Sequence, residues 1–328
     1  MYHIPDFEGP FREELVNFIN HKRSLGYDYG KGMVCRLAEM NRFLIAHELT
    51  DIRIPKAIYL SYIQLKDKES TSTQEKRYTA IHGFANFLIL RNYPDVYDIE
   101  NPVLKRDSFS PYIYSEVEIT SIFYCADRYK TERKPSMYDN NRMMPVLLRL
   151  LYSTGMRISE ALSLRLGDMD VEKGLISILD GKNHVGRNIV VSASMRCVLE
   201  NYIRTRNSFG AEEYLFHGYD GRAYTYDTVR LAFHRILDNA GIQRRPSGKY
   251  PRLHDLRHLF SIKALEQMAE KGYDLYTSLP ILCKYLGHKS ITETEYYIRL
   301  TQCRFVQLTN ASSKYAPNLF PDLEVQAV

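Results

Sequence analysis

A glycine, followed two residues later by an arginine, separates two helical segments in the stretch Leu151-Tyr152-Ser153-Thr154-Gly155-Met156-Arg157-Ile158-Ser159-Glu160-Ala161-Leu162. Residues 144–153 are largely apolar and predict a helix that Gly155 ends. A second, amphipathic helix is predicted over about 158–166, which places Arg157 at its start. An arginine at this position either solvates a helix end or reaches an anion, and the stretch alone allows both roles.

The segment that follows carries the only convincing β pattern in the sequence. Apolar residues at 175–178 lead into a turn at 180–186, and a β-branched run at 189–191 leads out of it. Two short runs of this kind around a Gly-containing turn are typical of a hairpin. From Ser194 onward helical spacing returns, and it continues through 256–268, 279–286 and 293–300. The predicted fold class is therefore mainly α with a small antiparallel β-sheet (α+β).

The first hundred residues predict a helical bundle. Apolar residues recur at helical spacing in four segments, at 11–19, 37–44, 58–65 and 78–88. Residues 93–111 hold three prolines and little periodicity, which indicates a linker. Ser115 and Glu118 then have the spacing of a capping box that begins a new helix. We therefore predict a helical domain at 1–100, a linker at 101–112 and a second domain at 113–328.

The composition is that of a globular protein. Hydrophobic residues make up 45% of the 328 residues and charged residues 25%, which excludes a largely disordered chain. No apolar run approaches the roughly 18 residues of a membrane span, and the first residues lack the pattern of a signal peptide. The five cysteines form no Cys-x-x-Cys pair. A reducing, cytoplasmic location without membrane association is expected.

The net positive charge of the chain arises in its second part. The first hundred residues hold 13 Lys and Arg against 14 Asp and Glu, so the net charge of +5 arises beyond them. The densest basic run, in which His254 and His258 are interleaved, consists of Arg244, Arg245, Lys249, Arg252 and Arg257. Such a run is either a solvated face or a nucleic-acid footprint, and charge alone does not choose between them.

Several common catalytic motifs are absent from the sequence. There is no Gly-x-x-x-x-Gly-Lys-Ser/Thr phosphate loop, no His-Glu-x-x-His metal motif and no Gly-x-Ser-x-Gly nucleophile turn. The acidic residues show no spacing that suggests a two-metal site. The sequence therefore predicts neither a bound metal nor a cofactor.

A series of basic and hydroxyl residues in the second domain has a recognisable order. Arg157 is followed by His254-x-x-Arg257, by Gly287-His288, and nine residues later by Tyr297. In this order the residues resemble the tyrosine recombinase (phage integrase) family. The matching boxes are the stretch quoted above, Leu253-His254-Asp255-Leu256-Arg257-His258, and Leu286-Gly287-His288 with Thr294-Glu295-Tyr296-Tyr297. Gly181-Lys182 stands where the family keeps a lysine, and the resemblance covers about 115–300 by motif.

The resemblance implies a site-specific DNA recombinase or integrase that needs neither ATP nor metal. Its N-terminal domain would be a helical core-binding domain that clamps DNA, and its second domain would be catalytic. Tyr297 would attack the phosphodiester to leave a 3′-phosphotyrosyl link, and Arg157 and Arg257 would grip the nonbridging oxygens. His254 would be the general base, Lys182 would protonate the leaving 5′-oxygen, and His288 would hydrogen-bond a nonbridging oxygen.

Two of these assignments have competitors nearby. Tyr296 has the same chemistry as Tyr297, and spacing from His288 favours Tyr297. His184 and Arg187 lie on the same turn as Lys182. The sequence also departs from the common pattern in an extra stretch at 269–276, as in recombinases of mobile elements, and in Leu166, where many members have tryptophan.

The expected partner is double-stranded DNA with a specific recombination site, bound by a homo-tetramer on paired sites. Each basic candidate for DNA contact could equally be ordinary surface charge; the candidates are Arg36, Arg42, Lys76 and Arg77 in the first domain and Arg244, Arg245, Lys249 and Arg252 in the second. The tail from about 301 to 328 could pack on a neighbouring protomer or on its own domain.

Two other functions remain open on the sequence alone. A type IB topoisomerase-like enzyme could nick and reseal one duplex with the same residues. A DNA-binding regulator without catalysis would require that the boxes be coincidental.

Overall fold

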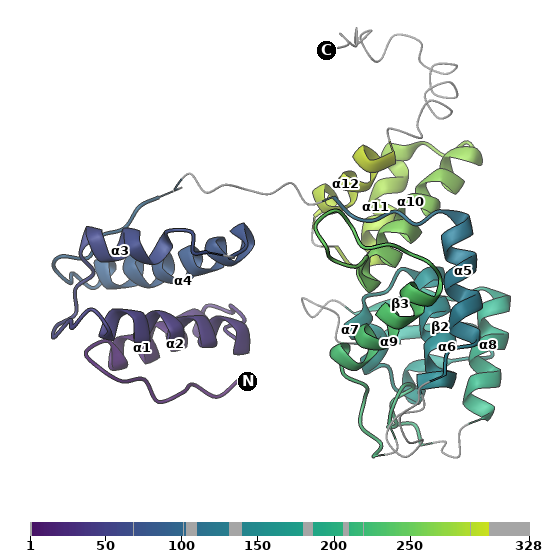
Figure 1. The fold of residues 1–328 in the computed structure, drawn as a ribbon, viewed down its shortest axis with the longest axis horizontal. Helices are drawn as coiled ribbons and strands as arrows, with labels where there is room; N and C mark the ends of the chain where they lie inside the picture. The colour runs from purple at the N-terminus through teal and green to yellow at the C-terminus, as the bar shows by residue number, and fades with distance from the viewer. Residues whose placement is uncertain are drawn as a thin grey trace, which may run out of the picture. The chain divides into compact units, whose positions relative to one another are not determined.

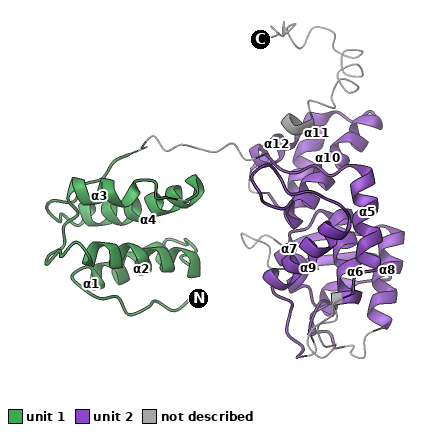
Figure 2. Ribbon diagram, viewed as in Figure 1, with its two compact units in different colours: residues 1–109 green, residues 110–328 purple. Residues whose placement is uncertain are grey.

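The computed structural model divides into two compact units, Met1–Phe109 and Ser110–Val328 (Figure 2). Their boundary lies within 101–112, the range predicted for the linker. The structure describes residues 2–67, 69–100, 102, 110–130, 140–179, 186–205, 210–218, 220–288 and 290–301, with only the backbone of 140, 296 and 298–301. Lys182, His184 and the tail beyond 301 lie outside the described residues.

The first unit is built from helices, in agreement with the predicted segments. Its described helices are α1 (Arg12–Ser24), α2 (Lys31–Ile45), α3 (Lys56–Ile63) and α4 (Thr71–Leu90) (Figure 1). In its core the centroid of the Phe84 ring lies 6.1 Å from that of Phe11 and 5.6 Å from that of Phe18. The side chain of Ser70 caps α4 by accepting the backbone N–H of Thr73. With this cap, α4 begins at Thr71, seven residues before the apolar segment predicted at 78–88.

The second unit combines several helices with a small sheet. Its first described helix, α5 (Glu116–Asp127), begins at the predicted capping box, in which Ser115 and Glu118 bond reciprocally. The helices that follow are α6 (Asn140–Thr154), α7 (Ile158–Ser163), α8 (Ala193–Arg204), α9 (Tyr226–Asn239), α10 (Leu253–Glu270), α11 (Leu275–Leu286) and α12 (Ile291–Thr301). The prediction that α7 reaches residue 166 was wrong, because Leu166–Asp168 form a separate 3-10 turn.

The sheet has three short antiparallel strands among the described residues. Its strands are β1 (Met169–Asp170), β2 (Leu175–Ile178) and β3 (Arg187–Val190), in the order β1-β2-β3. Ile176 pairs with Ile189 on one side and with Met169 on the other. The mainly α fold with a small antiparallel sheet is thus confirmed, and β1 adds a strand that the sequence did not predict.

Two apolar clusters form the core of the second unit. The larger joins α5–α9 to the sheet and the start of α10, and the smaller lies between α10, α11 and α12. The extra stretch at 269–276 comprises the end of α10, a turn at 271–274 and the start of α11. Gly287, with φ +68°, ends α11 in the left-handed region.

No described helix combines the length and the apolar character needed to cross a membrane.

Candidate active site

Gly155 sets the direction of the chain between α6 and α7. Its φ of +62° is one that a residue with a Cβ rarely adopts, and an added Cβ would lie 2.3 Å from the Phe260 ring. The resulting turn makes Arg157 the N-cap of α7. There the Arg157 backbone N–H donates to Glu160 Oε2 at 2.8 Å, and its Nη1 donates to Glu160 Oε1 at 2.9 Å.

Arg157 and Arg257 converge on the end of α11. Arg157 Nη2 donates to the carbonyl of Gly287 at 3.0 Å, and Arg257 Nη2 donates to that of Leu286 at 2.7 Å. Arg257 also donates from Nη1 to the Gly155 carbonyl at 2.8 Å. Neighbouring peptide carbonyls thus hold two head groups that start from helices 100 residues apart in the chain. Burial, with Arg157 nearby, lowers the pKa of Arg257 to about 10, so it stays a cation at neutral pH.

The Glu160 carboxylate is shared by Arg157 and a third arginine, Arg187. The buried Glu160 carboxylate accepts from Arg187 Nη1 at 3.0 Å and from Nη2 at 2.7 Å, in addition to its bonds from Arg157. Burial would raise the pKa of Glu160, but the hydrogen bonds from Arg187 and Arg157 outweigh it and lower the pKa to about 2. Arg187 Nε donates to the carbonyl of Tyr285 at 2.8 Å. Sequence reasoning had considered Arg187 only as a competitor of Lys182.

Three histidine rings lie close to one another or to the phenol of Tyr297. His254 and His258, one helical turn apart on α10, have centroids 4.9 Å apart, and His258 lies 5.5 Å from the ring of Tyr297. The centroid of the His288 ring lies 6.0 Å from that of Tyr297, and His288 Nδ1 is 2.9 Å from Thr294 Oγ1. Tyr297 is only 3% exposed. The phenol of α12 is therefore enclosed by imidazoles from two other segments.

These imidazoles are neutral at neutral pH. Burial, followed by the neighbouring cations and imidazoles, lowers the pKa of His254 and His288 to about 3 and that of His258 to about 4. Arg157 lowers the pKa of Arg257 and Tyr297 raises it, so the arginine pair and the phenol share one electrostatic environment. Each neutral ring has one nitrogen able to accept a proton.

The structure thus brings together five of the six predicted catalytic residues, namely Arg157, His254, Arg257, His288 and Tyr297. It does not describe Lys182, its competitor His184, or the side chain of Tyr296. His258 was missed as a member of the cluster, although its spacing of four from His254 on a predicted helix places both on one face.

The prediction that Arg77 contacts DNA was wrong. Its side chain is 6% exposed and forms a buried ion pair with Glu69. Nε donates to Glu69 Oε1 at 2.8 Å, and Nη2 donates to the carbonyl of Gln64 at 2.9 Å. The guanidinium therefore ties the start of α4 to the end of α3. Among the other first-unit candidates, Arg42 and Lys76 are exposed and Arg36 is half-buried.

The basic segment 244–252 leads directly into α10. Arg244 lies over the Tyr250 ring, 4.3 Å from its centroid, and Lys249 is exposed. The half-buried Arg245 donates to the carbonyl of Ser110 at 2.8 Å. Arg252 Nη2 donates to Asp255 Oδ1 at 3.1 Å, which holds it beside His254. The segment thus carries cationic side chains up to the first residue of α10.

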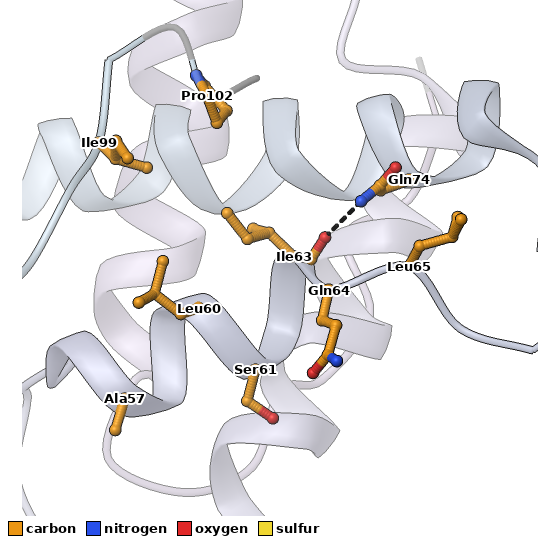
Figure 3. Close-up of a pocket in the computed structure, with 9 residues that line it drawn as sticks. All are labelled: Ala57, Leu60, Ser61, Ile63, Gln64, Leu65, Gln74, Ile99 and Pro102. Atoms are coloured by element: carbon orange, nitrogen blue, oxygen red, sulfur yellow. Dashed lines mark hydrogen bonds between the residues drawn. The ribbon is translucent and has the colours of Figure 1, made fainter. Parts of the chain in front are cut away.

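A cavity of about 580 Å³ in the first unit has a different character (Figure 3). It is lined by residues of α3, of the start of α4 and of the segment between these helices, together with Ile99 and Pro102, and its apolar walls include Leu60 and Leu65. Gln74 donates to the Ile63 carbonyl at 2.9 Å along one side, as the dashed line shows. None of its lining residues is titratable, so it offers no acid–base chemistry. Within the described residues no group of three His, Cys, Asp or Glu could hold a metal ion.

Paired arginines beside imidazoles and a phenol have the chemistry of an enzyme that transfers phosphodiesters. The model of the phage integrase family matches residues 120–304, more than half of the sequence, and the chain belongs to this family. It is thus a tyrosine recombinase, an enzyme that cleaves and rejoins DNA at specific sites.

Relatives match nearly the whole chain. A putative integrase/recombinase, y4rB, of Sinorhizobium fredii is 26% identical, and the match covers 88% of this chain and 92% of the relative. The tyrosine recombinase XerD of Oceanobacillus iheyensis is 28% identical over 89% of this chain and 94% of its own length. Among solved structures, the integrase of transposon Tn1549 in complex with transposon right end DNA is similar, with a TM-score of 0.65 and 16% identity, over 90% of this chain and 99% of that one.

Proposed function

We propose that this protein recombines double-stranded DNA by attack of the Tyr297 hydroxyl on a phosphodiester, which leaves a 3′-phosphotyrosyl link and a free 5′-hydroxyl. The observation that carries the proposal is the convergence of Arg157 and Arg257 on two successive carbonyls beside the ring cluster of Tyr297. The covalent link conserves the energy of the phosphodiester, so the strand can be rejoined to a new partner without ATP.

The arginine pair would stabilise the charge that develops on the nonbridging oxygens. Each guanidinium carries five N–H donors, and the described contacts occupy two of the Arg257 donors and two of the Arg157 donors. The remaining donors can grip a phosphate in the bidentate geometry that suits an oxyanion. Because both head groups are anchored to the backbone at their other edge, little reorganisation is needed at the moment of reaction.

The imidazoles and a lysine would move the protons. His254 would take the proton of the attacking phenol, whose ordinary pKa of about 10 makes it a poor nucleophile near neutral pH. A bound phosphate anion would raise the pKa of His254 from the low value it has in the free protein, which brings it into the range of an effective base. His288 would hydrogen-bond a nonbridging oxygen, and Lys182 would protonate the leaving 5′-oxygen.

The first domain would clamp the duplex against the catalytic domain. Arg36, Arg42 and Lys76 would contact phosphates from the first domain and Arg244, Arg245, Lys249 and Arg252 from the second. Four protomers would act on paired sites, with each tail contacting a neighbour. A lambda integrase tetramer bound to a Holliday junction, 16% identical with a TM-score of 0.62, offers support for this assembly.

The proposal is tested with a suicide DNA substrate, in which the short fragment that leaves with the free 5′-hydroxyl diffuses away after cleavage. The native protein is expected to form a denaturation-resistant adduct, and Tyr297→Phe is expected to form none because the nucleophile is lost. Tyr296→Phe is the matched control and should keep the adduct. No adduct from the native protein, or an undiminished one from Tyr297→Phe, would refute the proposal. Exchange between two marked duplexes then separates recombination from topoisomerase-like relaxation.

A further inference from the structure

Arg187, the first residue of β3, joins three parts of the site that are remote in the sequence. Its guanidinium binds Glu160 of α7 with both Nη atoms, and its Nε binds the carbonyl of Tyr285 in the last turn of α11. The side chain is 7% exposed. Arg187 is therefore buried, and three of its five N–H donors bind protein atoms.

The contact with α11 bears on both phosphate-gripping arginines. Tyr285 directly precedes Leu286 and Gly287, whose carbonyls hold Arg257 and Arg157. Gly287 also packs closely on Arg187, because an added Cβ would lie 2.9 Å from Arg187 Nη1. Arg187 therefore contacts the same turn whose carbonyls accept hydrogen bonds from Arg157 and Arg257.

The contact with Glu160 bears on charge. Glu160 is shared between Arg187 and Arg157, so one carboxylate balances two guanidiniums and the group keeps a net positive charge. Without Arg187 the same carboxylate would be paired with Arg157 alone and would cancel the charge that Arg157 offers to a phosphate. A buried carboxylate with half of its hydrogen bonds lost would also pull Arg157 toward itself.

We propose that Arg187 is a positioning residue, which acts through Glu160 and the Tyr285 carbonyl to orient Arg157 and Arg257 and to leave them cationic for the DNA phosphate. The inference rests on the proposed function, and it concerns a residue outside the motifs that identified the site.

The first test compares Arg187→Gln and Arg187→Lys with the native protein in the suicide-substrate reaction. We expect Arg187→Gln to slow adduct formation at saturating DNA by about 100-fold, the loss typical of a misplaced catalytic group, with little change in the Kd for DNA. Arg187→Lys keeps the positive charge but loses the planar guanidinium that binds Glu160 with two N–H groups. We therefore expect its rate of adduct formation to lie between those of the native protein and Arg187→Gln. Arg230→Gln, which breaks an exposed arginine pair with Asp227, is the matched control and should react at the native rate.

A second measurement separates positioning from a purely structural role. A substrate whose scissile phosphate is replaced by an uncharged methylphosphonate presents no negative oxygen pair for the arginines to neutralise. The defects of Arg187→Gln and Arg157→Lys should both shrink on it, whereas a defect due to partial unfolding would persist unchanged. Adding Glu160→Gln to Arg187→Gln should cost less than the sum of the two single changes, because the residues act as one unit.

The outcomes distinguish the two proposals. If the native protein forms no adduct, the proposed function fails. If the native protein forms the adduct and both Arg187 variants form it at the native rate, only the proposed role of Arg187 is overturned. A defect equal on charged and uncharged substrates, or additive with Glu160→Gln, would likewise overturn it.

Discussion

Gly155 shows how one residue without a side chain positions two cations. Its carbonyl accepts from Arg257, and its turn delivers Arg157 to the start of α7. We expect Gly155→Ala to lower the free energy of unfolding by about 2–5 kcal/mol, because it adds left-handed backbone strain to overpacking against Phe260. Urea unfolding of the variant measures the loss, and adduct formation should fall with it.

Gly221→Ala is the matched control for this prediction. Gly221 has a similar φ of +73°, but an added Cβ there meets no atom within 4 Å, so only the backbone strain remains. In the Gly155→Ala background, Phe260→Ala should cost less than it does alone, since it removes the clash. Equal losses at the two glycines would show that packing against Phe260 is unimportant.

Individual residues were predictable where a motif fixes both type and spacing. Arg157, His254 and Tyr297 follow from boxes read in order. Arg77 was misjudged, because its burial depends on the chain folding back to bring Glu69 against it. Arg187 could not be interpreted from its own neighbourhood either, since its partner Glu160 lies 27 residues away in the sequence.

At the scale of elements, periodicity predicted helices better than strands. The helices of the first unit bury regular apolar stripes, so their spacing reveals them. β1 has only two residues and owes its conformation to pairing with β2, for which no local pattern exists. Likewise α7 ends at Ser163 because Arg165 and Asp168 form a competing turn, in which the Arg165 N–H donates to Asp168 Oδ2 at 2.8 Å.

The packing of α10 against α12 and the end of α11 makes stability depend on pH. His254 and His258 have pKa values of about 3 and about 4 in the folded protein, because burial and the surrounding Arg252, Arg257 and His288 disfavour their charged forms. The unfolded chain takes up protons near pH 6.5, where the folded protein does not. The free energy of unfolding should therefore fall as the pH drops from 6.5 toward 4, by about 1.4 kcal/mol per pH unit for each histidine.

Urea unfolding at several pH values measures this slope. His254→Gln and His258→Gln should each make it shallower, since each removes one group that the unfolded chain protonates first. Glu160 has a pKa of about 2 in the folded protein, so below about pH 4.5 the unfolded chain protonates this carboxylate first. The free energy of unfolding then falls more steeply as the pH drops. A native profile that stays flat between pH 6.5 and 4 would contradict the assignment of these imidazoles as buried and neutral.

At the scale of the whole molecule, each unit has a core of its own. Among the described residues, the apolar cluster of the first unit ends at Ile99, and the clusters of the second unit begin at Tyr112. The sequence predicted this division from prolines and lost periodicity. The partners of surface charges were not predictable, because they depend on which side chains the finished fold leaves facing solvent.

Separate cores lead to a prediction about the isolated second unit. The fragment 110–328 should fold and keep a melting temperature close to that of the catalytic unit in the full chain, because its apolar clusters are complete within it. Its affinity for DNA should fall, since phosphate contacts proposed for Arg36, Arg42 and Lys76 are lost. The slope of log Kd against log salt should decrease by about 0.9 for each lost contact.

Full-length Arg42→Gln and Lys76→Gln supply the comparison, because each removes one exposed charge while both units remain. Each should weaken binding alike for specific and unrelated sequences and reduce the salt slope by about 1. Arg77→Met should instead lower stability through its broken pair with Glu69, while the folded fraction binds DNA as before. If the fragment and the full chain show the same affinity and the same salt slope, the first unit makes no phosphate contacts, and the clamp is not its role.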